Sequence, residues 1–246
     1  ETNTNWQHQA VIYEINTRNF SNHGTFRSVQ ERLPQLKTLG VNLIWFMPIH
    51  PIGKINRKGM LGSPYSVQNY REINPEFGSK NDFKELVQSA HDAGFKVIID
   101  WVANHTALDH PWVTKHPEYY LRNANGDFYP PDPLWTDVIG LNYQNSQLRL
   151  QMISEMNYWV NDFNIDGFRC DVAFMIPDEF WVQVREHFKL KGCDLFLLAE
   201  SGKPEHHRCG FNMTYGFDIH HTMRKIAKGG GSANTFWNEW LREESL

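Results

Sequence analysis

Six short apolar runs, separated by segments with helical periodicity, constrain the fold of this chain more than any other feature. The runs cover residues 11–15, 41–49, 95–102, 165–172, 194–200 and 213–218. Strands that alternate with helices indicate parallel βαβ units, and nearly continuous apolar strands indicate a sheet covered on both faces. The sequence therefore predicts an α/β fold built around a parallel sheet.

Polar side chains stand at or just beyond the C-terminal ends of these runs. They are Asp100, His105, Asp171 and Glu200. A TIM barrel places its active site at this end of its strands, so we predict a (β/α)8 TIM barrel, incomplete because about six of the eight strands are present. A doubly wound sheet, whose site also lies beyond the strand ends, is the alternative. No G-x-G-x-x-G follows the first run, which argues against a dinucleotide site.

Five segments carry apolar residues at helical spacing. They cover residues 28–39, 83–90, 152–160, 180–188 and 234–241. A capping-box pattern from Ser28 to Glu31 predicts where the first helix begins, although Pro34 falls inside that segment. Residues 106–145 show no periodicity. Irregular stretches of this length are usually functional, so we interpret them as an inserted loop region.

Composition excludes some partners. The net charge of −4 gives no basic footprint for nucleic acid, and no apolar run approaches the ~20 residues of a membrane helix. The polar N-terminus without Met is typical of a trimmed end. Three cysteines are too few for a disulfide framework, so the compartment stays open, with a secreted or periplasmic location slightly favoured.

Three charged residues on neighbouring runs suggest paired-carboxylate chemistry. Arg169 and Asp171 lie on one face of residues 165–172 because strand side chains alternate. Glu200 ends a purely apolar run, which predicts an apolar setting for its carboxyl group. A structural Arg169–Asp171 ion pair with Glu200 as a helix cap explains the same residues equally well at this point.

Three ordered motifs resemble those of the α-amylase superfamily of glycoside hydrolases, over essentially the whole chain. Residues 100–105 read Asp-Trp-Val-Ala-Asn-His, residues 167–171 read Gly-Phe-Arg-Cys-Asp, and residues 198–200 read Leu-Ala-Glu. They are similar to the family motifs of strands three, four and five. The resemblance implies that residues 1–246 are a partial catalytic barrel domain, with residues 106–145 as a small inserted domain.

The resemblance also implies catalytic roles. Asp171 would be the nucleophile and Glu200 the general acid/base, while Arg169 would keep Asp171 ionised and aligned. Retaining glycosidases hold their carboxyl groups only ~5–5.5 Å apart. Adjacent strands lie ~4.8 Å apart, which suits acids that end neighbouring strands.

Three further residues would contact the substrate. By the resemblance, His105 would hydrogen-bond the sugar in the cleavage subsite, Tyr65 would form an aromatic platform under it, and Asp100 would brace the site. Gly62 stands where some α-1,6-specific members carry an acid, which favours α-1,4 linkages.

Some positions depart from the family pattern. Gly140 stands where a calcium-binding acid is common, and residues 172–175 read Val-Ala-Phe-Met instead of carrying Lys-His. We therefore expect no cofactor, with a calcium ion held partly by Asn104 as the less favoured alternative. The pairs His206-His207 and His220-His221 lack a matching carboxylate or cysteine pattern, so we interpret them as exposed loop histidines.

The favoured function is a retaining hydrolase of α-1,4-linked glucans or maltooligosaccharides. A transglycosylase on the same scaffold would share every motif, and a non-catalytic carbohydrate-binding relative is the third alternative. Only six strands precede Leu246, and the third catalytic acid of the family is not found after Phe217. We therefore expect residues 1–246 to be inactive alone.

Overall fold

The computed structural model describes residues 5–244. Residues 1–4, which carry most of the polar N-terminal segment interpreted as a trimmed end, lie outside the described residues. Within residues 5–244, no helix is long and apolar enough to cross a membrane.

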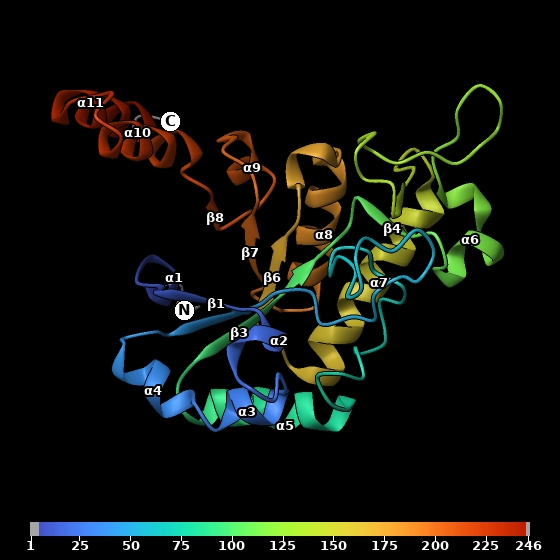
Figure 1. Cartoon of the computed structure of the whole chain (residues 1–246), viewed down its shortest axis with the longest axis horizontal. Helices are drawn as coiled ribbons and strands as arrows, with labels where there is room; N and C mark the ends of the chain where they lie inside the picture. Colours follow the sequence, from blue (N-terminus) through green and yellow to red (C-terminus); the bar gives the residue numbers. More distant parts are fainter. Residues whose placement is uncertain (1–4, 245–246) are drawn as a thin grey trace.

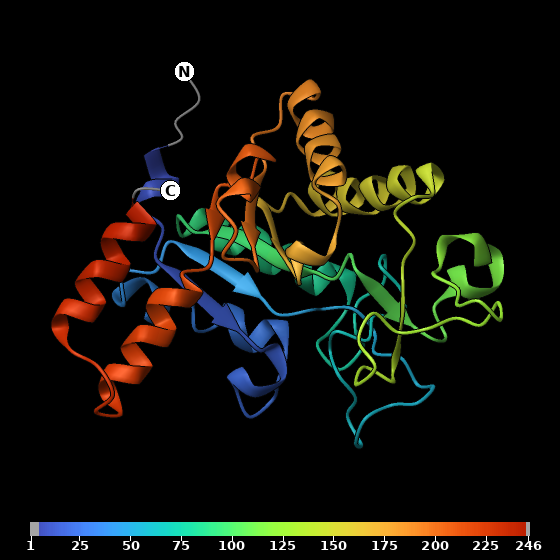
Figure 2. The ribbon, with the colours of Figure 1, turned by 90° about the horizontal axis from the view of Figure 1, so that it is seen from above.

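Six parallel strands form one sheet. The sheet is curled into an open half-barrel (Figures 1 and 2). Its strands are β1 (Ile12–Ile15), β2 (Leu43–Phe46), β3 (Lys96–Trp101), β6 (Gly167–Cys170), β7 (Phe196–Ala199) and β8 (Met213–Thr214). The strands pair in the order β1-β2-β3-β6-β7-β8, without a reversal. A doubly wound sheet needs a reversal of strand order, so the incomplete TIM barrel is confirmed over the described residues.

The sixth strand is shorter than predicted. β8 holds only Met213 and Thr214 of the predicted residues 213–218. Both side chains are half-buried, and β8 pairs with β7 at one edge of the sheet. α10 (Phe217–Ala227), which the sequence analysis did not predict, begins three residues later.

Amphipathic helices cover the outer face of the sheet. α5 (Lys80–Asp92), α7 (Ser146–Phe163) and α8 (Asp178–Leu190) bury their apolar residues there. The helix predicted over residues 28–39 is divided into α3 (Phe26–Gln30) and α4 (Leu33–Thr38).

Pro34 explains that division, because proline is tolerated in the first turn of a helix but not in its interior. The capping box predicted at Ser28 is wrong. Thr25 is the N-cap of α3 and accepts the Ser28 backbone N–H at 3.3 Å. A capping box does occur at Ser79 and Asp82, at the start of α5.

The remaining short helices lie at the ends of strands or in the connecting segments. They are α1 (Asn5–His8), α2 (Thr17–Phe20), α9 (Glu205–Arg208) and the 3-10 turn η2 (Ala173–Met175). α10 and α11 (Ala233–Glu244) lie side by side and project away from the sheet (Figure 1).

The segment after β3 is less irregular than its sequence suggests. β4 (His105–Ala107) and β5 (Val138–Gly140) pair as a small antiparallel sheet, with α6 (Pro111–Lys115) and the 3-10 turn η1 (Pro117–Tyr119) between them. Two strands of three residues are too short to show a periodic pattern, which is why the sequence did not reveal them.

One glycine sets how closely β6 and β7 approach. A Cβ atom on Gly167 would lie 1.9 Å from the backbone oxygen of Phe196, a distance that no side chain permits. Phe196 in turn packs against Trp6 inside the half-barrel, with ring centroids 5.3 Å apart. Gly167 therefore allows the strand contact that brings the ends of β6 and β7 together.

Candidate active site

Arg169 is the centre of the candidate site. Its side chain is 4% exposed, and its guanidinium donates hydrogen bonds to three partners and forms an ion pair with a fourth. Nη1 lies 2.8 Å from Oδ1 of Asp100 and 2.9 Å from Oδ1 of Asp171. Nη2 lies 2.9 Å from Oε1 of Glu200, and Nε donates to the Tyr215 hydroxyl at 3.1 Å.

Strand register explains why these side chains meet. Asp100 on β3 is the direct partner of Arg169 on β6. Cys170 pairs with Ala199 on β7, so Asp171 and Glu200 leave the sheet at the same level on neighbouring strands. The two acids therefore lie where the sequence predicted them, at the C-terminal ends of adjacent parallel strands.

The residue after Asp171 is held in an unusual conformation. Val172 has a φ of 39°, in the left-handed region that a β-branched residue rarely adopts. Its backbone N–H donates to Oε2 of Glu200 at 2.8 Å. Strained residues of this kind concentrate at functional sites, and here the turn connects the backbone next to one acid with the carboxylate of the other.

Burial and crowding of negative charge control the carboxyl groups. Burial raises the pKa of Asp171 well above its usual range, and the neighbouring Asp100 carboxylate raises it further, while Arg169 acts in the opposite direction. Burial likewise raises the pKa of Asp100 to about 6 against the pull of Arg169. Burial is the largest single effect on Arg169 and would lower its pKa, but the interactions with Asp100, Tyr215 and Asp171 together outweigh it and raise that pKa.

Arg169 lowers the pKa of Asp171, the direction expected from the sequence, but three carboxyl groups share its guanidinium. The apolar setting expected for Glu200 is absent. Its side chain is 25% exposed and its carboxylate pairs with Arg169. No helix begins at Glu200, since α9 starts only at Glu205, so the helix-cap alternative is wrong.

Of the three predicted substrate-contacting residues, Tyr65 and His105 line a hollow of about 410 Å³ at these strand ends, whereas Asp100 is fully buried and does not line it. The Tyr65 hydroxyl donates to Oδ2 of Asp100 at 3.2 Å, and its ring centroid lies 5.9 Å from the Arg169 guanidinium. Burial lowers the pKa of His105 to about 4. His105 is therefore neutral near pH 7 and can donate or accept a hydrogen bond without carrying charge.

Several residues that the sequence analysis did not select also belong to this site. Lys58, Trp135 and Asp137 line the hollow together with His105, and the ring centroid of Trp135 lies 5.3 Å from that of His105. Tyr215 contacts Arg169 from just beyond β8. Trp135 is an aromatic residue within the irregular insertion, and this was the one sequence signal that could have indicated it.

Asn104, the residue named in the calcium alternative, has several contacts within the protein. The Asn104 side-chain amide lies 3.3 Å from Nδ1 of His105 and 3.9 Å from the sulfur of Met175, and its backbone oxygen accepts from Leu141. Ca²⁺ requires six to eight oxygen ligands. Within residues 5–244, no cluster of three or more His, Cys, Asp and Glu side chains could hold a metal.

The interpretation of the four paired histidines is wrong for His206. This residue lies on α9 with 0% exposure and packs against Phe211. His207 is exposed, and His220 and His221 are exposed on α10 rather than in a loop. The helical packing of His206 was not visible because α9 is only four residues long.

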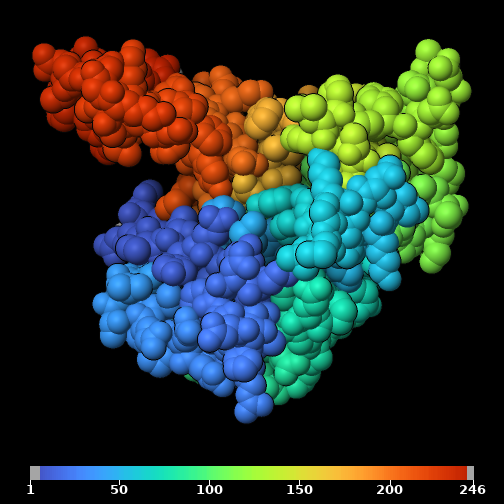
Figure 3. Space-filling model, in the orientation of Figure 1, coloured from blue at the N-terminus to red at the C-terminus, as the bar shows by residue number. Residues whose placement is uncertain are grey.

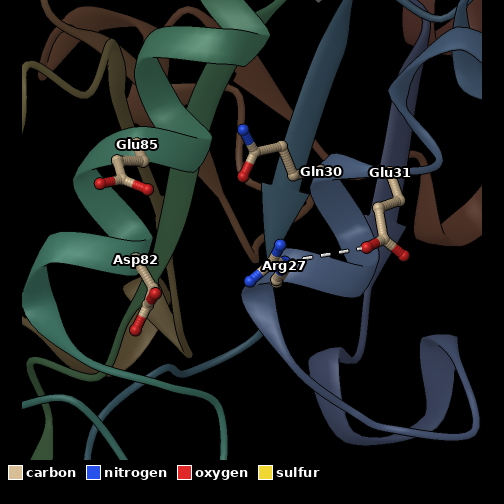
Figure 4. A pocket seen from close by; sticks show the side chains of 5 residues that line it. All are labelled: Arg27, Gln30, Glu31, Asp82 and Glu85. Carbon is tan, nitrogen blue, oxygen red and sulfur yellow. Dashed lines mark ion pairs between the residues drawn. The ribbon is translucent and has the colours of Figure 1, made fainter.

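A second hollow, of about 480 Å³, lies on the outer face between α3 and α5 (Figure 4). Its lining residues are Arg27, Gln30, Glu31, Asp82 and Glu85. Two of its acids have structural roles, since Asp82 caps α5 and Glu31 pairs with Arg27 at 3.9 Å. It contains no aromatic platform and lies away from the strand ends, so we do not regard it as the active site.

Comparisons with known proteins agree with this geometry. The family model for the alpha-amylase catalytic domain matches residues 13–139, more than half of the chain. The structure is similar to that of an alpha-amylase from Lactobacillus plantarum, with a TM-score of 0.93 and 35% identity over 98% of this chain and 60% of that one. It is also similar to a noncanonic maltogenic alpha-amylase from Thermotoga neapolitana, with a TM-score of 0.89 and 39% identity over 96% of this chain and 55% of that one.

A curated relative with a different activity is the alpha-1,4-glucan:maltose-1-phosphate maltosyltransferase of Mycolicibacterium smegmatis. It is 30% identical over 198 residues, which cover 73% of this chain and 28% of that protein. The chain spans about a third of the length of the curated relatives that it matches.

The half-barrel with acids at the ends of β6 and β7 defines a glycoside-hydrolase-like catalytic domain. With the family match and the structural similarity, the chain belongs to the alpha-amylase family.

Proposed function

We propose that this chain carries the nucleophile and the acid/base of a retaining hydrolase that acts on α-1,4-linked glucans or maltooligosaccharides. One observation carries the proposal. The carboxylates of Asp171 and Glu200 are bound by the two terminal nitrogens of the same guanidinium, each at 2.9 Å. This arrangement supports the short carboxyl separation of retaining enzymes rather than the ~6.5–9.5 Å of inverting ones.

In the proposed reaction, Asp171 attacks the anomeric carbon while Glu200 donates a proton to the departing glycosidic oxygen. Asp171 then carries a covalent glycosyl ester. In the second step Glu200 takes a proton from water, which attacks the same carbon and releases Asp171. Burial raises the pKa values of Asp171 and Asp100, and the Arg169 guanidinium opposes the rise in both, which favours the ionised form that a nucleophile requires.

The walls of the hollow suit a sugar. Tyr65 and Trp135 offer aromatic faces, and neutral His105 offers a hydrogen bond to a hydroxyl group. Ligand sites commonly combine apolar faces with a few placed polar groups. These features support a carbohydrate substrate, and the α-glucan class comes from the family to which the chain belongs.

A fluorinated glucosyl donor, applied to the complete protein, tests this proposal because it accumulates the covalent intermediate. We expect peptide mapping to find the label on Asp171, and NMR of the first hydrolysis product to show the retained anomer. Label on another residue, or an inverted first product, would contradict the retaining assignment.

Transglycosylation is the second candidate function, because a maltosyltransferase is among the relatives. Such an enzyme would use the same ester on Asp171 but transfer the sugar to a second sugar instead of water. Product analysis with and without an added acceptor sugar separates the two reactions. The third alternative, a non-catalytic binder, is disfavoured because Asp171, Glu200 and Arg169 are all present and in contact.

A further inference from the structure

The loop formed by residues 53–66 has fixed ends. The backbone N–H of Gly53 donates to the Ser66 oxygen at 2.8 Å, and Ile52 forms an antiparallel bridge with Val67. Inside the loop, Nε of Arg57 donates to the Gly53 oxygen at 2.8 Å. The base of the loop is therefore closed, and the orientation of its tip depends on contacts made elsewhere.

Those contacts reach the insertion. Nζ of Lys58 lies 3.1 Å from Oδ1 of Asp137 and donates to the Leu134 backbone oxygen at 2.8 Å. The side-chain amide of Asn56 donates to the Thr136 oxygen at 3.3 Å. The loop and the insertion are also adjacent on the surface, where the cyan atoms of the loop meet the yellow-green atoms of the insertion (Figure 3).

The Lys58–Asp137 contact is more than a surface ion pair. The Asp137 side chain is only 5% exposed, whereas that of Lys58 is 46% exposed. A buried carboxylate is costly unless it is paired, so Asp137 binds the lysine that reaches in from solvent. The Ser66 hydroxyl also donates to the Asp137 backbone oxygen at 2.9 Å, which ties the base of the loop to the same residue.

This ion pair is part of the active-site wall. Lys58 and Asp137 both line the hollow that contains Asp171 and Glu200. Ser63 and Tyr65 from the loop and Trp135 and Val138 from the insertion continue the same wall. On this side of the two acids, the loop and the insertion are thus joined rather than separated by an open groove.

We propose that the Lys58–Asp137 ion pair closes one side of the active site and makes the protein select the end of an α-glucan chain over its interior. This inference rests on the proposed function. When the interior of a glucan binds, glucose units extend from the reacting sugar in both directions. The joined wall blocks one of these two directions. A chain end needs only one exit.

A linear and a cyclic glucan with the same number of glucose units test the proposal, because a ring has no chain end. We would measure the affinities of maltoheptaose and β-cyclodextrin by calorimetry, in the protein as it occurs naturally and with Asp171→Asn to prevent turnover. We expect the linear ligand to bind at least about tenfold more tightly, the scale of one charge-assisted hydrogen bond. Lys58→Met should reduce that ratio toward one.

Two further variants keep the test decisive. Lys58→Met leaves Asp137 unpaired, so Lys58→Met combined with Asp137→Asn opens the wall without a buried charge and should give the same reduced ratio. Lys54→Met is the matched control, because Lys54 is exposed in the same loop and contacts Asp109 through its backbone. It should leave the ratio unchanged.

The outcomes separate the two proposals. If maltoheptaose binds but the ratio of the two affinities is the same in the native sequence and in both Lys58 variants, chain-end selection is overturned and the α-glucan function is not. Equal binding of ring and linear ligand by the native sequence would do the same. Binding of neither ligand would overturn the α-glucan function and the chain-end inference with it.

Discussion

Nη1 of Arg169 lies 2.9 Å from Oδ1 of Asp171, a residue only two positions further along the chain. The same nitrogen also binds Asp100, and the other terminal nitrogen binds Glu200. One guanidinium thus fixes the geometry of three carboxyl groups from three strands. Changes to the acids and changes to the arginine's supports should therefore have different kinetic effects.

Removing either acid should abolish catalysis while leaving binding intact. An amide cannot form the glycosyl ester or transfer the proton, and general acid catalysis alone contributes ~10²–10⁴-fold. In the complete protein we expect Asp171→Asn and Glu200→Gln each to lower kcat at least ~100-fold, measured on a maltooligosaccharide. A loss of less than tenfold in either variant would exclude that residue from its role.

Tyr215 should act as a positioning residue through Arg169. Tyr215→Phe keeps the ring, whose centroid lies 5.7 Å from the guanidinium, but removes the oxygen that accepts the Nε hydrogen. Losing one such hydrogen bond costs ~1 kcal/mol, so we expect kcat to fall about fivefold with KM nearly unchanged.

Tyr13→Phe provides the matched control for Tyr215. Tyr13 lies on β1 and packs against Phe20, away from the guanidinium contacts. The Tyr13→Phe substitution should leave kcat unchanged. Equal kinetic effects of the two substitutions, or a Tyr215 effect confined to KM, would show that Tyr215 does not position Arg169.

Three buried histidines should make the fold sensitive to acid. Burial lowers the pKa of His50 to about 4, of His105 to about 4 and of His110 to about 3. The unfolded chain takes up these protons below about pH 6.5, whereas the folded chain does not. Stability is therefore lost as the pH falls from about 6.5 toward 4, by roughly 3 kcal/mol at most for each histidine.

Asp100 acts with the opposite sign. Its pKa is raised to about 6, so the folded state binds a proton that the unfolded state lacks between about pH 4 and 6. Asp171, whose pKa is also raised, adds to this. Burial also lowers the pKa values of His187 and His206 and raises that of Glu14. Since five histidines oppose three acids, we expect the thermal midpoint to fall between pH 6.5 and 4.5.

His50→Asn tests the histidine contribution. It keeps a donor for the Glu72 oxygen, which His50 Nδ1 contacts at 3.1 Å, but removes the titrating ring. The dependence of the midpoint on pH should become shallower, whatever the absolute stability. A native midpoint that stays level or rises on acidification would contradict the prediction.

The sequence predicted the parts of the site that depend on order along the chain. β6 and β7 are apolar runs with acids at their ends, and parallel strands bring such ends to one edge. Lys58 and Tyr215 could not be found this way, because their roles depend on contacts with Asp137 and Arg169 that no local pattern encodes. α10 was missed since it follows directly on a strand of two residues.

The open edges of the sheet allow a prediction of how residues 1–246 associate when they are expressed alone. Within the described residues, β1 and β8 each have one strand neighbour, so each presents backbone groups on its other side. Unpaired strand edges are templates for association. The interior cluster of Leu43, Trp45, Ile98, Phe196 and Leu198 also lies in a barrel that six strands do not close.

We therefore expect this polypeptide alone to self-associate and to lack activity on starch. About eight strands make a filled barrel, and full closure removes sheet edges. Size-exclusion chromatography should show oligomers that grow with concentration, and the thermal transition should be broad. A monomer with a sharp transition and starch hydrolysis would show that six strands with α10 and α11 suffice for folding and catalysis.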